Sequence, residues 1–488
     1  MPSQQLDHLD ASDKATTTVS GRTPAVVRLL VLATFVVILN ETILINAIPP
    51  LMTALDITEQ TAQWLSTAFL LTMAAVIPIT GWFLQRVSTR SAYTTAMGLF
   101  LLGTALAAVA PSFEVLLGAR VVQASGTAVM MPLLMTTLMQ VVPESDRGRV
   151  MGNVTLAISV APAMGPAVSG AILHFGSWRL LFVVVFPIAA LIAWQGLKHL
   201  KNVGESKFST IDWLSVVTAA AGFAGLVYGL SRFEGGDVRV AAAIVATGLL
   251  TIAVFVLRQL SLQKRGVPLL DLRTLRHRTY TVALIMMATA FMSMFGSMVL
   301  LPLYLQNVRG LSVLETGLLV MPGGLAMGLL GPTVGRLFDR FGGRVLVIPG
   351  AIGITLALAG FTQITMTMPY WQILGLHVLL MLSLAASFTP VFTLGLGAVP
   401  PPLYSHASSI LGTLQQVFGA IGTALVITVM SARAETLKVS GATEALANLG
   451  GMRLAFIIGA GLSLIVIVTA LLLPARAEST GEFTGAGH

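Results

Sequence analysis

A single carboxylate interrupts the first long apolar stretch of the chain. Of the 20 acidic residues, Glu41 is the only one placed well inside an apolar run long enough to cross a membrane. An ionised carboxylate in hydrocarbon costs roughly 3 kcal/mol or more, so it usually faces a polar cavity. The residues one turn away carry no positive charge: Val37, Ile38, Leu44 and Ile45. Burial favours the neutral carboxyl, which suits a group that gains and loses a proton. The alternative is a structural hydrogen bond to a neighbouring helix.

Arg120 is the charge that could balance Glu41. It lies in another apolar run, and Gln123, three residues on, extends the same helical face. At 1.5 Å per residue, Glu41 lies about 21 Å from the start of its helix. Arg120 lies about 9 Å from the start of its own helix, which enters from the opposite side, so both reach a similar level in a core about 30 Å thick. We predict that they share one polar cavity. An arginine bound only to backbone carbonyls is the alternative.

Flexible and aromatic apolar side chains gather in two further runs. Thioethers and rings make adaptable walls that accept ligands of several shapes, although packing against lipid explains such residues equally well. Together with the polar residues near Glu41, they form the predicted substrate cavity: Asn40, Gln123, Met131, Phe291, Met294, Phe295 and Met298.

The composition indicates which elements position these side chains. The 488 residues are 55% hydrophobic and only 10% charged, with a mean hydropathy of +0.87, which is too little charge to cover a water-soluble protein of this size. The net charge of +8 comes from basic residues in short gaps between apolar runs, so it indicates membrane topology rather than nucleic-acid binding. The sequence has no cysteine, which excludes disulfides and thiolate metal sites.

No motif for ATP hydrolysis or metal catalysis is found in the chain. The sequence therefore predicts a protein that is not an enzyme, that needs no cofactor or metal, and that takes its energy from an ion or substrate gradient. The expected partners are small amphipathic substrates, protons and membrane lipid, with no nucleic acid and no obligatory protein partner.

Apolar runs of about 20 residues predict fourteen membrane-spanning helices and an all-α fold. The expected spans are 26–50, 61–84, 91–110, 114–140, 149–173, 179–197, 211–231, 238–257, 279–304, 312–334, 345–364, 370–395, 407–431 and 453–474.

Loop charge predicts the orientation of these spans. With the N-terminus in the cytoplasm, twenty of the 28 basic residues fall on the inner side and seven on the outer, as expected for cytoplasmic loops. A missed span would invert every later loop. We therefore expect a multi-pass plasma-membrane protein with cytoplasmic tails at 1–24, predicted to be disordered, and 476–488.

A repeat at two inner turns predicts two related halves. Glycine and two arginines recur with identical spacing after the second and tenth spans: Gly81, Arg86 and Arg90, then Gly335, Arg340 and Arg344. Transporters built from such halves bind substrate between them near the membrane midplane. The alternative is that any tight inner turn uses glycine and arginine. The expected division is a bundle at 25–200, a linker with two extra helices at 201–260, and a second bundle at 261–475.

The predicted fifth span contains the small residues and prolines of 161–170, including Gly165, Pro166 and Gly170. Proline removes helix hydrogen bonds and glycine lets another helix approach closely, so a kink and a tight helix contact are expected.

These motifs resemble the major facilitator superfamily, specifically its fourteen-helix drug and proton antiporters of the lincomycin-resistance type, from about Val31 to Leu473. The stretch 335–344, with Asp339, looks like the family's Gly, Asp, Arg, Gly, Arg signature, which implies a charged latch between helices; in the first copy Gln85 replaces the acid and Ser88 a glycine. Arg120 to Gly126 resembles the fourth-helix motif, whose arginine the family associates with proton transfer, and Gly165-Pro166 with Gly170 the antiporter motif. Residues 39–43 resemble the first-helix motif, with Asn40 where many relatives have aspartate, so the carboxylate is shifted by one residue to Glu41.

The resemblance implies a major facilitator fold of two six-helix bundles plus two inserted helices, and proton-coupled efflux of amphipathic drugs by alternating access. Lincomycin-like compounds and lipophilic cations are the expected substrates. Three alternatives stay open: export of a single endogenous metabolite, a membrane sensor that binds a ligand without transport, and an uptake facilitator.

Overall fold

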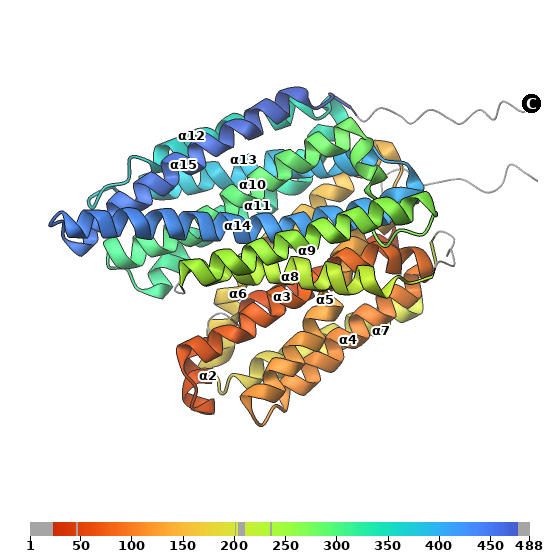
Figure 1. Cartoon of the computed structure of the whole chain (residues 1–488), viewed down its shortest axis with the longest axis horizontal. Helices are drawn as coiled ribbons and strands as arrows, with labels where there is room; N and C mark the ends of the chain where they lie inside the picture. Colours follow the sequence, from red (N-terminus) through yellow and green to blue (C-terminus); the bar gives the residue numbers. More distant parts are fainter. Residues whose placement is uncertain (1–22, 45–46, 201, 204–209, 235–236, 477–488) are drawn as a thin grey trace, which may run out of the picture.

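The computed structural model describes residues 23–44, 47–200, 202–203, 210–234 and 237–476. The predicted tails, 1–24 and 476–488, lie almost wholly outside these residues. Of the predicted linker at 201–260, only residues 201, 204–209 and 235–236 lie outside them. The described residues form an all-helical protein (Figure 1).

The helices follow the predicted spans. Thirteen are long and apolar enough to cross a membrane, and a bent helix, α6, makes a fourteenth. In chain order the α-helices are α1 (Ala25–Ile43), α2 (Ile48–Leu55), α3 (Glu59–Arg86), α4 (Thr89–Ala108), α5 (Phe113–Val141), α6 (Arg147–His174), α7 (Arg179–His199), α8 (Trp213–Ser231), α9 (Val238–Lys264), α10 (Arg278–Leu303), α11 (Val313–Phe341), α12 (Arg344–Phe361), α13 (Tyr370–Gly397), α14 (Tyr404–Val439) and α15 (Glu444–Leu472).

Two details of the prediction are wrong. The first span does not run to residue 50, because α1 ends at Ile43 and the short helix α2 starts at Ile48. Two prolines in the first turn of α2 explain the break, since proline starts a helix readily but cannot continue one. The glycine and arginine motifs also do not lie in turns. Gly81 and Arg86 belong to the end of α3, and Gly335 and Arg340 to the end of α11.

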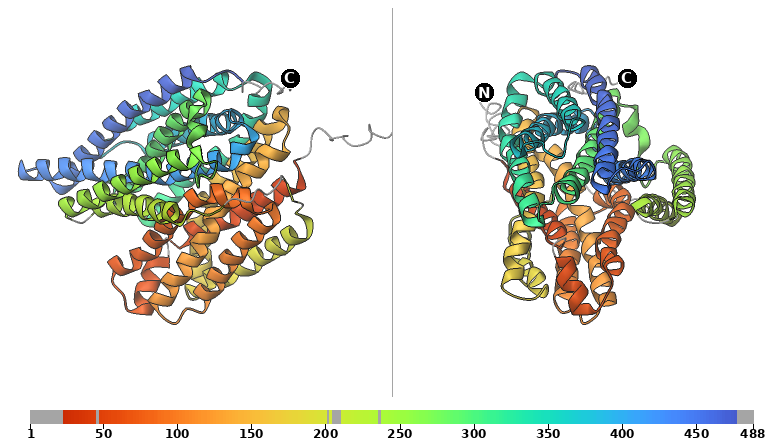
Figure 2. Two further views of the ribbon diagram at one scale, coloured as in Figure 1. Left: turned by 45° about the vertical axis from the view of Figure 1, so that its right-hand side comes forward. Right: turned by 90° about the vertical axis from the view of Figure 1, so that its left-hand side faces the viewer.

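Six-helix bundles form the two halves of the molecule. Helices α1 and α3–α7 pack together, as do α10–α15, and the halves meet where α6 packs on α11 and α3 on α14 (Figures 1 and 2). Helices α5 and α13 are the most enclosed, with 78% of the apolar window of each buried. The side chains of α5 and α13 therefore face protein rather than lipid along most of their length.

The two extra helices lie outside these bundles as a pair (Figure 1). Only 17% of the apolar window of α9 is buried, and α8 contacts both α3 and α14. At one end of the pair, Asp212 binds Arg258 through two hydrogen bonds of 2.6 Å. These bonds hold the pKa of Asp212 well below its usual range, so the carboxylate stays charged at neutral pH. The pair therefore spans the boundary between the two bundles on one side of the molecule.

Candidate functional site

The end of α1 carries the only run of three polar residues in that helix. Asn40 is buried, Glu41 is half-buried, and Thr42 donates a hydrogen bond of 3.0 Å to the Leu39 carbonyl of its own helix. The Thr42 hydroxyl is thereby satisfied without a partner from another helix. Asn40 and Glu41 remain available for contacts with the neighbouring helices.

Arg120 on α5 is the most deeply buried charged side chain among the described residues of the first bundle and is only 1% exposed. Its Nη1 donates to Gln123 Oε1 at 2.6 Å and to Asn40 Oδ1 at 3.4 Å. The guanidinium also lies over the Phe69 ring, 4.1 Å from the ring centroid, which is an attractive cation–π arrangement. Gln123 in turn donates from Nε2 to Thr104 at 2.8 Å. Helices α1, α3, α4 and α5 thus each contribute one part of this buried polar network.

Glu41 adjoins the network but makes no ion pair of 4 Å or less with Arg120 in the described part of the chain. Arg120 is nevertheless the charged group that acts on the Glu41 carboxylate. Asn40, the neighbour of Glu41 in the sequence, accepts the hydrogen bond from Arg120 through its amide oxygen. The structure therefore brings Asn40, Gln123 and Arg120 into contact and places Glu41 beside them without a direct bond.

The close approach of α4 and α5 depends on glycine. A Cβ on Gly126 would lie 2.3 Å from the Ala96 carbonyl oxygen, and one on Gly103 would lie 2.5 Å from the Gln123 backbone nitrogen. This contact puts Thr104 within reach of Gln123. Phe69 and Thr104 are not among the residues predicted from the sequence. A hydroxyl in an apolar span is a weak signal for Thr104, whereas nothing in the sequence distinguishes Phe69 from other apolar residues.

The antiporter-like stretch of α6 packs against the same end of α1. A Cβ on Gly165 would lie 2.2 Å from Thr42 Oγ1, next to Glu41. The helix also bends by 41° between the stretches Glu144–Gly165 and Ala167–His174, as the prolines and glycines predict. At Gly170, by contrast, no atom of another described helix lies within 4 Å of such a Cβ. The two glycines of this motif therefore differ in their packing.

This difference gives a testable prediction. Gly165→Ala should lower the stability of the protein by about 1–3 kcal/mol, since the added methyl must displace Thr42 and the end of α1. Gly170→Ala on the same helix is the matched control and should leave the unfolding temperature unchanged. Thermal unfolding of the two purified variants measures the difference, and equal unfolding temperatures would contradict the packing described here.

A second polar cluster joins the bundles at the end where α1 begins and α15 ends. Asp339 on α11 accepts hydrogen bonds of 2.8 Å from the backbone N–H groups of Gly148 and Arg149, in the first turn of α6. A helix N-terminus favours a carboxylate through both its free N–H groups and its dipole. A Cβ on Gly335 would lie 2.1 Å from the Gly148 carbonyl oxygen. Asp339 and Gly335 together close α6 against α11.

The other motif arginines have varied surroundings. Arg344 donates from Nε to the Leu473 carbonyl at 2.8 Å and so ties α12 to the end of α15. Arg340 lies over the Phe341 ring at 5.0 Å, and Arg86 over the Trp82 ring at 5.4 Å. The backbone N–H of Arg90 donates to Asn202 at 3.3 Å.

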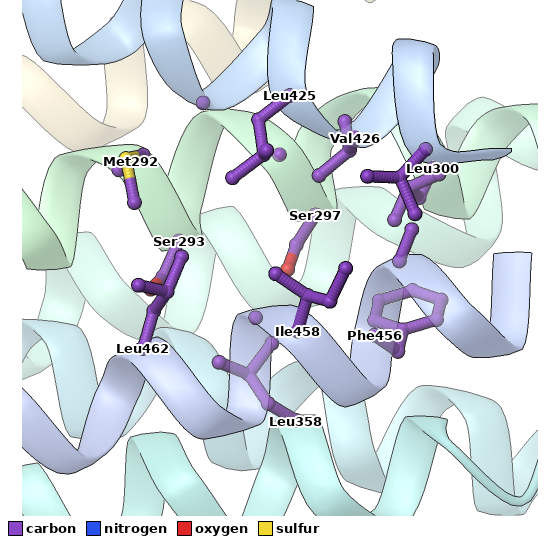
Figure 3. A pocket seen from close by; sticks show the side chains of 15 residues that line it. Met292, Ser293, Ser297, Leu300, Leu358, Leu425, Val426, Phe456, Ile458 and Leu462 are labelled. Carbon is purple, nitrogen blue, oxygen red and sulfur yellow. The ribbon is translucent and has the colours of Figure 1, made fainter. Parts of the chain in front are cut away.

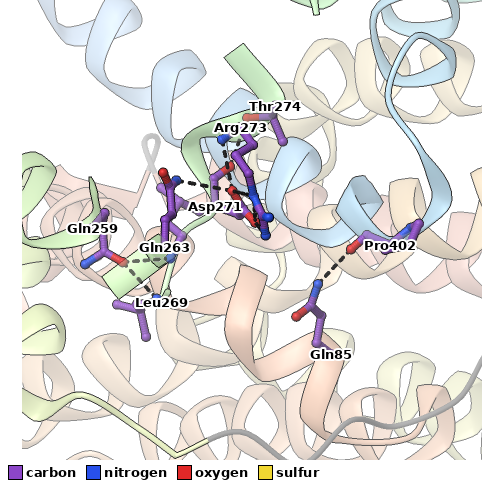
Figure 4. Close-up of polar contacts among 9 residues, drawn as sticks. Gln85, Gln259, Gln263, Leu269, Asp271, Arg273, Thr274 and Pro402 are labelled. Atoms are coloured by element: carbon purple, nitrogen blue, oxygen red, sulfur yellow. Dashed lines mark hydrogen bonds and ion pairs between the residues drawn. The ribbon is translucent and has the colours of Figure 1, made fainter. Parts of the chain in front are cut away.

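In the first copy of the motif the contact between the bundles is uncharged. Gln85 on α3 donates from Nε2 to the Pro402 carbonyl at 2.8 Å, just before α14 begins (Figure 4). Gly81 makes room for His406, whose Nδ1 would lie 2.9 Å from a Cβ added there. Further along the same interface, the Thr80 and Ser409 hydroxyls share a hydrogen bond. The two halves are thus closed against each other at this end along both interfaces.

The apolar residues predicted to line a substrate cavity do not share one surface in this structure. Phe291 packs in a cluster with Phe388, at 4.7 Å between ring centroids, and with Phe392. Phe295 faces Gly419 on α14, whereas Met298 is 48% exposed. Met131 and Met294 are half-buried. A small apolar cavity between α10, α14 and α15, lined by Met292 among others, holds only about 20 Å³, room for a single water (Figure 3).

The comparison with known proteins decides the family. Residues 30–423 match the family model of the Major Facilitator Superfamily. The chain belongs to this superfamily. It is 37% identical to the MFS-type transporter YcnB of Bacillus subtilis, over 90% of this chain and 93% of that protein. It is 38% identical to the lincomycin resistance protein LmrB of Listeria innocua, over 91% of this chain and 95% of that protein. The superfamily consists of membrane transporters rather than enzymes, and the chain is a multi-pass membrane protein.

Solved structures of the superfamily share the fold of the chain. The human organic anion transporter MFSD10 matches with a TM-score of 0.64 at 14% identity, covering 92% of this chain and all of that one. The proton:xylose symporter XylE matches with a TM-score of 0.60, also at 14% identity, covering 92% of this chain and 94% of that one. Two six-helix bundles plus two inserted helices therefore describe this superfamily member.

Proposed function

We propose that this transporter exports amphipathic drugs in exchange for protons, with Glu41 as the proton-carrying group and Arg120 as the charge that controls it. The observation that carries the proposal is the half-buried Glu41 carboxylate in the last turn of α1, beside a fully buried arginine network. The names of the relatives support the drug class, because they include lincomycin resistance proteins and a multidrug resistance protein B homolog of Mycobacterium tuberculosis.

The mechanism needs only a difference in affinity between two states. Protonation of Glu41 from outside favours one orientation of the bundles, and drug bound from the cytoplasm favours the other. The energy source is the proton gradient, with no cofactor. The moving bodies are residues 25–200 and 261–475, joined by the linker with its two helices at 201–260, and both termini lie in the cytoplasm. In this orientation, the polar clusters around Asp339 and Gln85 lie on the cytoplasmic side and keep it closed.

The drug-binding wall belongs to the same proposal. Asn40 and Gln123 supply polar contacts, while Met131, Phe291, Met294, Phe295 and Met298 supply adaptable apolar surface once the bundles move apart. Flexible thioethers suit ligands of several shapes. Export of one endogenous metabolite is the competing function, and it predicts a response to one ligand class only.

Drug-driven proton movement in proteoliposomes tests the function. Purified transporter is reconstituted with a pH-sensitive dye inside, and lincomycin or ethidium is added. A proton signal with both compounds supports drug and proton exchange. Drug transport without a proton signal contradicts the coupling. The absence of both transport and a proton signal with every drug supports a dedicated metabolite exporter.

Asp339→Asn should weaken the closure of the cytoplasmic side. Hydrogen bonds to a charged group contribute about 1.5–3 kcal/mol each, so losing the charge at two of them should lower the closed-to-open ratio at least tenfold, or about 1.4 kcal/mol. The chain has no cysteine, so Ser145→Cys and Phe341→Cys provide the only two sites for spin labels, in both the wild type and Asp339→Asn. In Asp339→Asn we expect a larger population of molecules with a longer distance between the two labels. An unchanged distance distribution would show that Asp339 does not hold the bundles together.

A further inference from the structure

The two copies of the repeated motif meet their partner helices differently. In the second copy, Asp339 binds the N–H groups of Gly148 and Arg149, the second and third residues of α6. In the first copy, Gln85 holds the sequence position of Asp339, and the partner helix is α14. Gln85 donates to a carbonyl before α14 rather than accepting from its N–H groups. Within the described ranges, no side chain caps the start of α14. The start of α14 therefore lacks a carboxylate like the one that Asp339 provides at the start of α6.

A cavity of about 260 Å³ lies beside this uncapped helix start. Both bundles line it. The first bundle contributes Gln85, Thr136, Thr137 and Gln140, and the second contributes Asp271, Arg273, Ser405 and His406. Two of these residues have buried polar atoms without a hydrogen-bond partner in the described part of the chain: Ser405 Oγ, in a residue 4% exposed, and His406 Nδ1, in a residue 3% exposed. They are the second and third residues of α14, the positions that correspond to Gly148 and Arg149.

The one acidic side chain of this cavity is already neutralised. Asp271 accepts from the backbone N–H, Nε and Nη2 of Arg273, and from Gln263 Nε2 at 3.2 Å (Figure 4). Burial opposes ionisation of Asp271, but the hydrogen bonds from Arg273 outweigh it and hold the pKa of this carboxyl below its usual value. Asp271 and Arg273 therefore form an ion pair without net charge, and the positive end of the α14 dipole adds a positive potential to the cavity.

We propose that this cavity binds a small anion bearing a carboxylate or phosphate group, which accepts a hydrogen bond from Ser405 Oγ at the start of α14. Such an anion compensates the positive end of α14, as the Asp339 carboxylate does at the first turn of α6. A phosphate group fills only part of the volume, so the cavity admits a small organic anion or a lipid headgroup. Because both bundles line the site, the anion ties them together and stabilises the state that is closed at this end. The proposal is independent of which substrate the transporter moves.

Anion-dependent thermal unfolding of the purified, full-length transporter tests the proposal. Inorganic phosphate is titrated against chloride at equal ionic strength, and phosphate is expected to raise the unfolding temperature of the wild type. Ser405→Ala should weaken the apparent phosphate affinity about tenfold, because it loses a hydrogen bond to a charged group. Gln85→Glu supplies the missing carboxylate from the protein itself, so it should raise the unfolding temperature without phosphate and abolish the phosphate response. Ser409→Ala, on the same helix but outside the cavity, is the matched control and should keep the full response.

The source of the anion is distinguished by a second arm. The same measurement in nanodiscs of phosphatidylcholine, with and without phosphatidylglycerol, reports binding of an anionic lipid headgroup. A shift with inorganic phosphate supports a free anion, and a shift only with phosphatidylglycerol supports a lipid. No shift in either arm, or a phosphate response that is unchanged in both Ser405→Ala and Gln85→Glu, would overturn the proposal.

Discussion

Glu41→Gln is expected to abolish drug-evoked proton release while leaving the protein folded. Glutamine keeps the shape of glutamate but cannot carry the proton, so the coupling energy between drug and proton is lost. Couplings between sites are typically about 1–3 kcal/mol. The proton signal per drug molecule should therefore fall at least about tenfold in proteoliposomes, while drug binding measured by ethidium fluorescence persists.

The control for this variant is Glu435→Gln. Glu435 lies near the end of α14 and is exposed, so its replacement should leave the proton signal intact. A Glu41→Gln transporter that still releases protons on drug addition would remove Glu41 from the mechanism. The buried arginine network would then be a structural feature of the first bundle.

Arg120→Lys is expected to reduce both stability and coupling, although the charge is conserved. Lysine has no planar fork to lie flat over Phe69 while it donates to both Gln123 and Asn40. The loss of buried, charge-assisted hydrogen bonds should cost about 1.5–3 kcal/mol each. We expect a lower unfolding temperature and a proton signal reduced about tenfold or more.

Arg336→Lys is the matched control for this substitution. Arg336 is exposed on α11, and among the described residues it donates only to Pro332 and Thr333 of the same helix, so the same exchange should have little effect there. The pH dependence of drug-evoked proton release separates the two possible roles of Arg120. A profile unchanged in Arg120→Lys, together with reduced stability, would make Arg120 a structural residue that does not control the proton on Glu41.

The membrane spans could be predicted because each is a local property of the chain. A helix hides its backbone polar groups within itself, so an apolar run of sufficient length is enough to predict a span. The positions of the helix ends were harder to predict from the sequence. Helices α11 and α14 extend to Phe341 and Val439, several residues beyond the apolar runs, because polar residues can continue a helix outside the hydrocarbon. Helix α11 continues through Gly335 and ends only before Gly342, which has a positive φ of 82°.

The sequence by itself determined the fold class and the identity of the rare polar residues within the spans, since length, hydropathy and motif spacing are local. It placed Glu41 and Arg120 at similar depth but did not show that Asn40 takes the hydrogen bond from Arg120, or that Phe69 and Thr104 complete the network. Those contacts depend on the rotation and close approach of four helices, which glycines such as Gly126 permit through packing that no single segment encodes. The same reason applies at the end of the molecule where α14 begins. The exchange of an acid for Gln85 is visible in the sequence, whereas the cavity and the uncapped start of α14 beside it exist only once the two bundles meet.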